Sequence, residues 1–234
     1  MKPRLISLPL AEFATRSAAL IEEEIRAAIA ARGACRLALA GGETPRAIYA
    51  ALPVDLPWEK VWITFGDERC VPPDDKDSNY KMARESLLDR VPTAHVLRIR
   101  GEIPQEPAAA EYEQLLAVEA ARTGEARFVH DLILLGMGED GHTASLFPGM
   151  ETLKETVRSV LPAHGPKPPP QRVTMTLPLL NAARKVFFLA KGAGKAEMLR
   201  RVLSGDPSLP SALVHPAQGE VAWLLSDDLA AAVQ

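Results

Sequence analysis

The fold is indicated most clearly by residues 131–145, DLILLGMGEDGHTAS, in which a continuous apolar run leads into a glycine-rich turn. Such a run is typical of a strand that is covered on both faces, as in a parallel sheet. The same order of strand, glycine turn and following segment occurs at residues 36–45 (RLALAGGETP) and 186–195 (VFFLAKGAGK). Because turns of this kind in an open α/β sheet lie beyond the carboxyl ends of the strands, we expect the three turns to converge on one site.

Along the rest of the chain, short apolar runs alternate with longer helical patterns. This alternation predicts an α/β fold that is Rossmann-like, with a mainly parallel sheet and helices on both faces. Residues 164–171, HGPKPPPQ, are expected to form an extended surface loop, after which the strand pattern resumes and completes the sheet. We therefore predict a single domain over residues 1–234. The expected strands are 36–40, 61–65, 95–99, 131–135, 172–177, 186–190 and 221–225, with 4–8 as a candidate first strand, and the expected helices are 10–32, 45–52, 78–90, 107–122, 195–203 and 227–232.

The composition excludes several classes of protein. With 27 Lys and Arg against 30 Asp and Glu, the net charge is −3, and only 5% of residues are aromatic, which argues against nucleic-acid binding and against a polybasic membrane anchor. Two cysteines, Cys35 and Cys70, cannot form a disulfide framework, which favours a reducing compartment. Glu12 and Arg16 interrupt any signal-peptide run, and no stretch reaches the roughly 20 apolar residues of a membrane span. We expect a cytoplasmic protein.

The first glycine turn, residues 41–45, admits two interpretations. It fits a tight turn in which Thr44 is the N-cap and Pro45 is the first helical residue. It also fits a phosphate site, in which the bare backbone N–H groups of Gly41 and Gly42 and a helix N-terminus hold the anion. Lys195, after the third turn, is either a partner of the same anion or an ordinary solvated lysine.

The glycine spacing does not indicate a nucleotide site. Residues 136–141 match the pattern G-x-G-x-x-G, but Asp140 would bring a negative charge to the pyrophosphate, and no acidic residue closes a strand about 20 residues later. Residues 194–195 resemble the end of a P-loop, but they lack the Ser or Thr that should follow, and Leu189 stands where the first glycine should be.

Asp140 and His142, separated by one glycine, are the first catalytic candidates. An imidazole suits proton transfer near neutral pH. A lone histidine in a loop is more often structural, but glycines at the end of a strand favour the catalytic interpretation. The chain contains no HExxH, paired CxxC or G-x-S-x-G pattern, so neither a built-in zinc site nor a serine nucleophile is expected.

A fourth turn follows the strand expected at 61–65 and carries Asp67, Glu68 and Arg69. A run of charges is by default a solvated loop. The guanidinium of Arg69 is also suited to hold a phosphate or to stabilise an oxyanion. Arg172, at the start of the strand after the proline-rich stretch, is either an anion ligand or an ordinary charge on an edge strand.

Four blocks of sequence, in order and spanning most of the chain, together resemble the 6-phosphogluconolactonases. They are GGETP (41–45), FGDERCVPPDDKDSNY (65–80), LLGMGEDGHTASLFPG (134–149) and KGAGKAEMLRRVL (191–203). The resemblance implies a Rossmann-like enzyme that hydrolyses 6-phospho-D-glucono-1,5-lactone to 6-phosphogluconate, the second step of the pentose phosphate pathway. It implies no metal or organic cofactor, and we expect a monomer or a weak homodimer.

Site residues follow from the resemblance position by position. His142 matches the general base, with Asp140 beside it, and Asp67 and Arg69 line the sugar end. The phosphate is expected against Gly41, Gly42 and Thr44, with Arg172 and Lys195 as cationic partners. The family's first turn usually reads Ser-Gly-Gly-Ser-Thr-Pro, whereas Ala40 and Glu43 replace both serines here, so two hydroxyl ligands are lost.

A mechanism follows from these roles, and two other functions compete with it. A neutral His142 takes a proton from the water that attacks the lactone carbonyl, and Arg69 or glycine N–H groups stabilise the oxyanion. In the related glucosamine-6-phosphate deaminases, Asp-Gly-His runs into Ile-Ala-Phe-Asn-Glu-Pro; this chain has an apolar residue at the glutamate position, which weakens an isomerase or deaminase function with Asp67 as base. A sugar-phosphate sensor would usually carry a DNA-binding module, and the chain has no basic helix-turn-helix segment.

Overall fold

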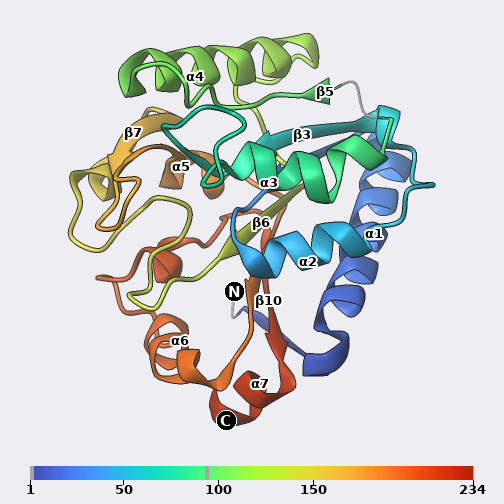
Figure 1. Ribbon diagram of the computed structural model, residues 1–234, viewed down its shortest axis with the longest axis vertical. Helices are drawn as coiled ribbons and strands as arrows, with labels where there is room; N and C mark the ends of the chain where they lie inside the picture. The colour runs from blue at the N-terminus through green and yellow to red at the C-terminus, as the bar shows by residue number, and fades with distance from the viewer. Residues whose placement is uncertain (1–2, 93–94, 234) are drawn as a thin grey trace.

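The computed structural model describes residues 3–92 and 95–233, and its centre is a seven-stranded parallel sheet of order β1-β10-β9-β6-β2-β3-β5 (Figure 1). The predicted Rossmann-like α/β fold with a mainly parallel sheet is confirmed. All four residues from Leu132 to Leu135 are buried, because neighbouring elements cover both faces of β6. The strands of this sheet are β1 (Arg4–Leu8), β2 (Cys35–Leu39), β3 (Val61–Phe65), β5 (His95–Val96), β6 (Leu132–Gly136), β9 (Lys185–Ala190) and β10 (Glu220–Ser226).

Helices occupy the connections between these strands, close to the expected ranges. The expected helix at 10–32 consists of a 3-10 turn followed by α1, which ends where Gly33 adopts a φ of 79° and donates its N–H to Ile29 O. The α-helices are α1 (Phe13–Arg32), α2 (Glu43–Ala51), α3 (Asn79–Ser86), α4 (Gln105–Arg122), α5 (Leu177–Leu180), α6 (Ala196–Leu203) and α7 (Asp227–Val233). The 3-10 helices are η1 (Leu10–Glu12), η2 (Trp58–Lys60), η3 (Leu88–Arg90), η4 (Glu151–Lys154), η5 (Ala193–Lys195) and η6 (Pro210–Leu213).

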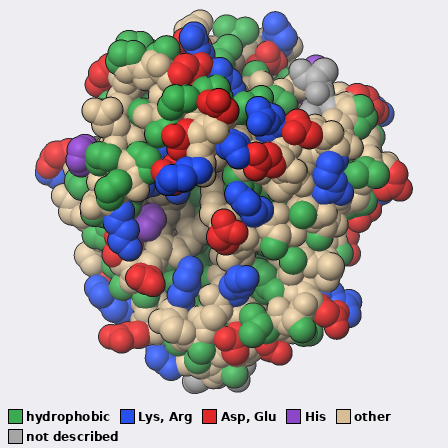
Figure 2. All heavy atoms as spheres, in the orientation of Figure 1, with side chains coloured by type: hydrophobic (Ala, Val, Ile, Leu, Met, Phe, Trp, Pro, Cys, Tyr) green, Lys and Arg blue, Asp and Glu red, His purple; other side chains and the backbone are tan. Residues whose placement is uncertain are grey.

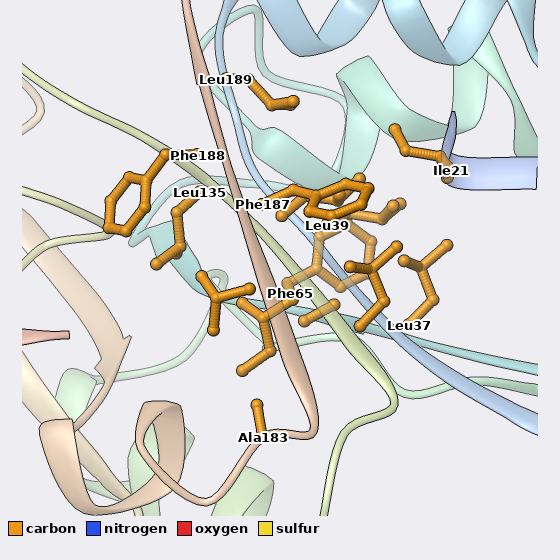
Figure 3. Packing of buried hydrophobic residues seen from close by; sticks show 14 of the residues in the cluster. Ile21, Leu37, Leu39, Phe65, Leu135, Ala183, Phe187, Phe188 and Leu189 are labelled. Carbon is orange, nitrogen blue, oxygen red and sulfur yellow. The ribbon is translucent and has the colours of Figure 1, made fainter. Parts of the chain in front are cut away.

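The apolar core lies between the sheet and its covering helices. Buried side chains of β2, β3, β6 and β9 form one cluster with those of α1, and Figure 3 shows part of it, including Ile21, Leu37 and Phe187. Phe188 and Trp223, on neighbouring strands, stack with ring centroids 4.0 Å apart. Each fully buried side chain of this size stabilises the fold by about 1.5–3 kcal/mol relative to exposure, so the sheet is a rigid base for the turns at its edge.

A second, antiparallel sheet is the main difference from the sequence-based expectation. It has the order β4-β8-β7 and consists of β4 (Asp67–Arg69), β8 (Gln171–Met175) and β7 (Val160–His164). The expectation that the strand at 172–177 completes the main sheet is therefore wrong. The proline-rich stretch instead closes the hairpin between β7 and β8, with Gly165 N donating to Pro170 O over 2.7 Å. An apolar run shows that a strand is buried but does not specify the strand with which it pairs.

Two buried tyrosines fix the backbone at the carboxyl ends of β2 and β3. The hydroxyl of Tyr49 accepts a hydrogen bond from Ala40 N (2.8 Å) and donates one to Ala40 O (3.0 Å). The hydroxyl of Tyr112 makes the same pair of bonds with Phe65 N (2.9 Å) and Phe65 O (3.0 Å). Buried backbone groups need such partners, so the chain is held firmly just before the turns that carry the candidate site residues. Among the described helices, none combines the length and the apolar character that a bilayer crossing requires.

Candidate active site

A cavity of about 250 Å³ opens at the carboxyl ends of the central strands, beside the second sheet. Figure 2 shows a hollow on this face of the molecule with Lys and Arg side chains around it. All the predicted site residues except Asp140 line the cavity: His142, Asp67, Arg69, Gly41, Gly42, Thr44, Arg172 and Lys195. The turns converge as the sequence predicts, and the space suits one small molecule rather than a dinucleotide.

Asp140 lies behind His142 and orients its ring. The Oδ1 of Asp140 is 2.5 Å from His142 Nδ1 and accepts a second hydrogen bond from His142 N over 3.1 Å. Partial burial acts to raise the pKa of Asp140, but its hydrogen bonds to His142 outweigh this and hold the pKa below its usual value. An ionised Asp140 thus fixes the tautomer in which Nδ1 carries the proton and leaves Nε2 as the basic nitrogen.

Gly138 gives the imidazole its space. A Cβ at this position would lie 2.1 Å from His142 Nδ1 and 2.8 Å from Asp140 Oδ1, so only glycine lets the ring lie against the backbone. The ring of Phe147 also packs against the imidazole, with its centroid 4.6 Å from that of His142. The imidazole therefore contacts both a glycine backbone and an aromatic ring, while part of it stays exposed.

Asp67 is buried beside the cavity and is held by two residues that the sequence analysis did not single out. Ser145 Oγ donates to Asp67 Oδ2 over 2.6 Å, and Asn79 Nδ2 donates to Asp67 Oδ1 over 3.1 Å. Both carboxylate oxygens are therefore engaged by neutral donors. Asn79 and Ser145 fall inside the blocks that carry the family resemblance, but the local pattern gives no sign of a contact between segments so far apart in the chain.

Glu68, the neighbour of Asp67, anchors the start of α3. Its carboxylate accepts hydrogen bonds from Arg69 N (2.8 Å), Asn79 N (2.7 Å), Tyr80 N (2.8 Å) and Ser78 Oγ (3.1 Å). Burial raises the pKa of Glu68 to about 7, against the opposing effect of these backbone N–H groups. The charge run was expected to be a solvated loop by default; at Glu68 it is instead a buried cap of the helix.

Arg69 and Arg172 are brought together by the second sheet. They are paired directly across β4 and β8, and both line the cavity. Arg69 Nη1 donates to Asp77 O over 2.6 Å and Arg172 Nε to Pro169 O over 3.1 Å, but neither forms an ion pair with a carboxylate in the described part of the chain. Burial lowers the pKa of Arg172. Two adjacent guanidinium groups without a carboxylate partner favour a multiply charged anion.

The first glycine turn differs in detail from its predicted form. Gly42, at a φ of 104°, precedes α2, which begins at Glu43, so the expectation of Thr44 as N-cap and Pro45 as first helical residue is wrong. The backbone N–H groups of residues 41–44 have no acceptor among the described residues. Glu43 borders the cavity, but its side chain is 86% exposed and its carboxylate lies 3.7 Å from Arg46 Nε. These free N–H groups are available to an anion.

Lys195 reaches the cavity from the third turn. Its Nζ donates to Met137 O over 2.8 Å, in the loop that carries His142. Burial lowers the pKa of Lys195, and Glu139 partly opposes this effect. Lys195 is thus partly buried beside the cavity, and its role as a partner of an anion stays a prediction. Within residues 3–92 and 95–233, no group of three or more His, Cys, Asp or Glu side chains is arranged to hold a metal ion.

Comparisons with known proteins agree on one family. Residues 10–223 match the family model of glucosamine-6-phosphate isomerases/6-phosphogluconolactonase. A 6-phosphogluconolactonase of Homo sapiens is 42% identical over 207 residues, covering 86% of this chain and 79% of the relative, and one of Nostoc is 42% identical over 218 residues, covering 90% and 89%. The structure of 6-phosphogluconolactonase from Trypanosoma brucei superimposes with a TM-score of 0.85 at 31% identity, covering 100% of this chain and 99% of that one.

Proposed function

The chain belongs to the glucosamine-6-phosphate isomerase/6-phosphogluconolactonase family, and we propose that it hydrolyses 6-phospho-D-glucono-1,5-lactone to 6-phospho-D-gluconate. The observation that carries the proposal is the 2.5 Å contact between His142 Nδ1 and Asp140, which leaves Nε2 of a cavity-lining histidine as the basic nitrogen. The free N–H groups of residues 41–44 and the cations around the cavity support a phosphorylated substrate.

His142 acts first as a general base. Its Nε2 takes a proton from a water molecule while the water oxygen forms a bond to C1 of the lactone. The tetrahedral oxyanion then expels the ring oxygen, and the imidazolium returns the proton to that oxygen, which becomes the 5-hydroxyl of the product. Asp140 stabilises the imidazolium during the time that His142 carries the extra proton. General base assistance of this kind supplies about 10²–10⁴-fold in rate.

The remaining residues bind and orient the lactone. We assign the phosphate to Gly41, Gly42 and Thr44 together with Arg172 and Lys195, and the oxyanion to Arg69 or to N–H groups of the turns. Asp67 lies at the sugar end of the cavity. Binding of the remote phosphate holds C1 beside His142, so the affinity for the phosphate is converted into orientation of the reacting carbonyl.

No observation favours the competing isomerase or deaminase function. In such a reaction Asp67 would act as the base, whereas both of its oxygens already accept hydrogen bonds from Ser145 and Asn79. The glutamate position of the deaminase motif is apolar in the run 142–148, HTASLFP. We also propose that the lactonase is a cytoplasmic protein with a single domain, and that it is a monomer or a weak homodimer.

The proposal is tested by the initial rate of acid release from freshly generated 6-phosphogluconolactone. The unphosphorylated lactone and the variant His142→Ala serve as controls, and release of ammonia from glucosamine 6-phosphate tests the competing function. We expect rapid hydrolysis that depends on both the phosphate and His142. A rate equal to that of buffer would refute the activity, and full turnover by His142→Ala would refute the mechanism.

A further inference from the structure

We infer that Asn79 is a specificity-determining residue, whose side-chain oxygen Oδ1 accepts a hydrogen bond from a ring hydroxyl of the sugar lactone. Asn79 is the first residue of α3, lines the cavity and is only 3% exposed. The inference rests on the proposed function and assigns a role to a residue to which neither the sequence analysis nor the proposed mechanism gives one.

Hydrogen bonds fix which end of the Asn79 amide faces the cavity. Its Nδ2 donates to Asp67 O over 2.9 Å and to Asp67 Oδ1 over 3.1 Å. Both partners are acceptors, so the NH₂ end must face them and the oxygen must lie on the other side. The backbone N–H of Asn79 is in turn held by Glu68 Oε1 over 2.7 Å. The side chain is therefore rigidly positioned before any ligand binds.

The amide oxygen lies against the first glycine turn. A Cβ on Gly41 would be 2.0 Å from Asn79 Oδ1 and 2.5 Å from its Cγ, so the approach requires glycine at that position. No residue in the described ranges donates a hydrogen bond to this oxygen. Asn79 thus presents an unmatched acceptor at the wall of the cavity, and such a group is costly to leave without a donor.

The chemistry of this part of the wall selects a hydroxyl. Asp67, which faces the NH₂ end of the amide, also lines the cavity, so both residues carry acceptor oxygens at this part of the wall. The unpaired amide oxygen of Asn79 matches the O–H of a hydroxyl, which can donate a hydrogen bond, whereas an ionised phosphate oxygen cannot. The cations assigned to the phosphate are other residues, Arg172 on β8 and Lys195 after the third glycine turn. A sugar lactone offers hydroxyls at C2, C3 and C4, and one of these meets Asn79.

Ser145 provides a matched control for a purely structural role of Asn79. Like Asn79, it is buried and donates to the carboxylate of Asp67, over 2.6 Å, but it does not line the cavity. Ser145→Ala therefore removes one support of Asp67 without removing the acceptor. If Asn79 served only to hold Asp67, the two variants would behave alike.

The experiment combines these variants with substrates that lack one hydroxyl. We would measure kcat/KM for 6-phosphogluconolactone and for its 2-, 3- and 4-deoxy analogues, using the wild type, Asn79→Ala and Ser145→Ala, with thermal unfolding of each protein as a check on folding. For one analogue, the wild type should lose about 10-fold or more in kcat/KM. In Asn79→Ala that discrimination should fall to about 1, while Ser145→Ala should keep it whatever its overall activity.

The outcomes separate this inference from the proposed function. A wild type that discriminates against no analogue, or an Asn79→Ala variant that keeps the full discrimination, would overturn the role of Asn79 and leave the lactonase activity intact. A wild type inactive on the parent lactone would overturn both. Asn79→Ser, whose hydroxyl can still donate to Asp67, takes the place of the alanine variant if that variant does not fold.

Discussion

Gly138→Ala should inactivate the enzyme without unfolding it. The added Cβ would lie 2.1 Å from His142 Nδ1 and 2.2 Å from Cε1, whereas ordinary contacts begin at 3.4 Å. The ring must therefore retreat by more than 1 Å, which also breaks its contact with Asp140. Misplacement of a reacting group by about 1 Å lowers the rate by about 10²-fold. We expect kcat on 6-phosphogluconolactone to fall by at least that factor.

The fold should tolerate the same change. Gly138 is outside the left-handed region of φ, and the His142 and Asp140 side chains are 31% and 46% exposed, so the ring can move into solvent. The melting temperature, followed by circular dichroism, should therefore stay within a few degrees of the wild type. Gly194→Ala is the matched control, since a Cβ there meets nothing within 4 Å and Gly194 does not line the cavity. Its turnover should match the wild type.

A double variant, Gly138→Ala with His142→Ala, tests whether Gly138→Ala acts through His142. If Gly138→Ala acts only by displacing His142, then adding it to His142→Ala should cause no further loss of kcat, because the two changes remove the same contribution. Wild-type turnover by Gly138→Ala, or a large additional loss in the double variant, would refute the view that the packed position of His142 is the catalytic one.

Three further predictions concern the rest of the site and its frame. Because burial lowers the pKa of Lys195, this lysine should lose its charge at a lower pH than an exposed lysine does. Inhibition of the wild type by 6-phosphogluconate should therefore weaken at alkaline pH, whereas the Lys195→Arg variant should remain inhibited at the same alkaline pH. Gly41→Ala should place a methyl group 2.0 Å from Asn79 Oδ1 and lower kcat/KM by about 10-fold, with steady-state kinetics as the measurement. Tyr49→Phe should leave the buried N–H and C=O of Ala40 unpaired and lower the free energy of unfolding in urea by about 1–3 kcal/mol. An unchanged free energy of unfolding would show that the Tyr49 hydroxyl does not stabilise the backbone at Ala40.

Short-range features of the chain were predictable because their physics is local. Apolar runs and glycines located the strand ends, and the sequence singled out Asp140 and His142 in one turn, although their spacing alone did not establish the contact that the structure shows. The convergence of the turns followed from the geometry common to parallel sheets. Helix starts were less accurate: the helix expected at 45 begins at Glu43, since glycine rather than threonine takes the capping position.

Contacts between segments far apart in the chain determined features of the site that the sequence did not predict. The run at 172–175 reads like any buried strand, and only its pairing with β4 brings Arg172 opposite Arg69. The roles of Glu68, Asn79 and Ser145 likewise depend on partners in other segments. Burial and hydrogen-bond satisfaction are properties of the folded chain, because a polar residue in a strand end or loop has the same local pattern whether water or a distant side chain satisfies it. The sequence by itself therefore determined the parallel α/β frame and the candidate residues Asp140 and His142, and the tertiary structure alone determined which polar side chains meet around the cavity.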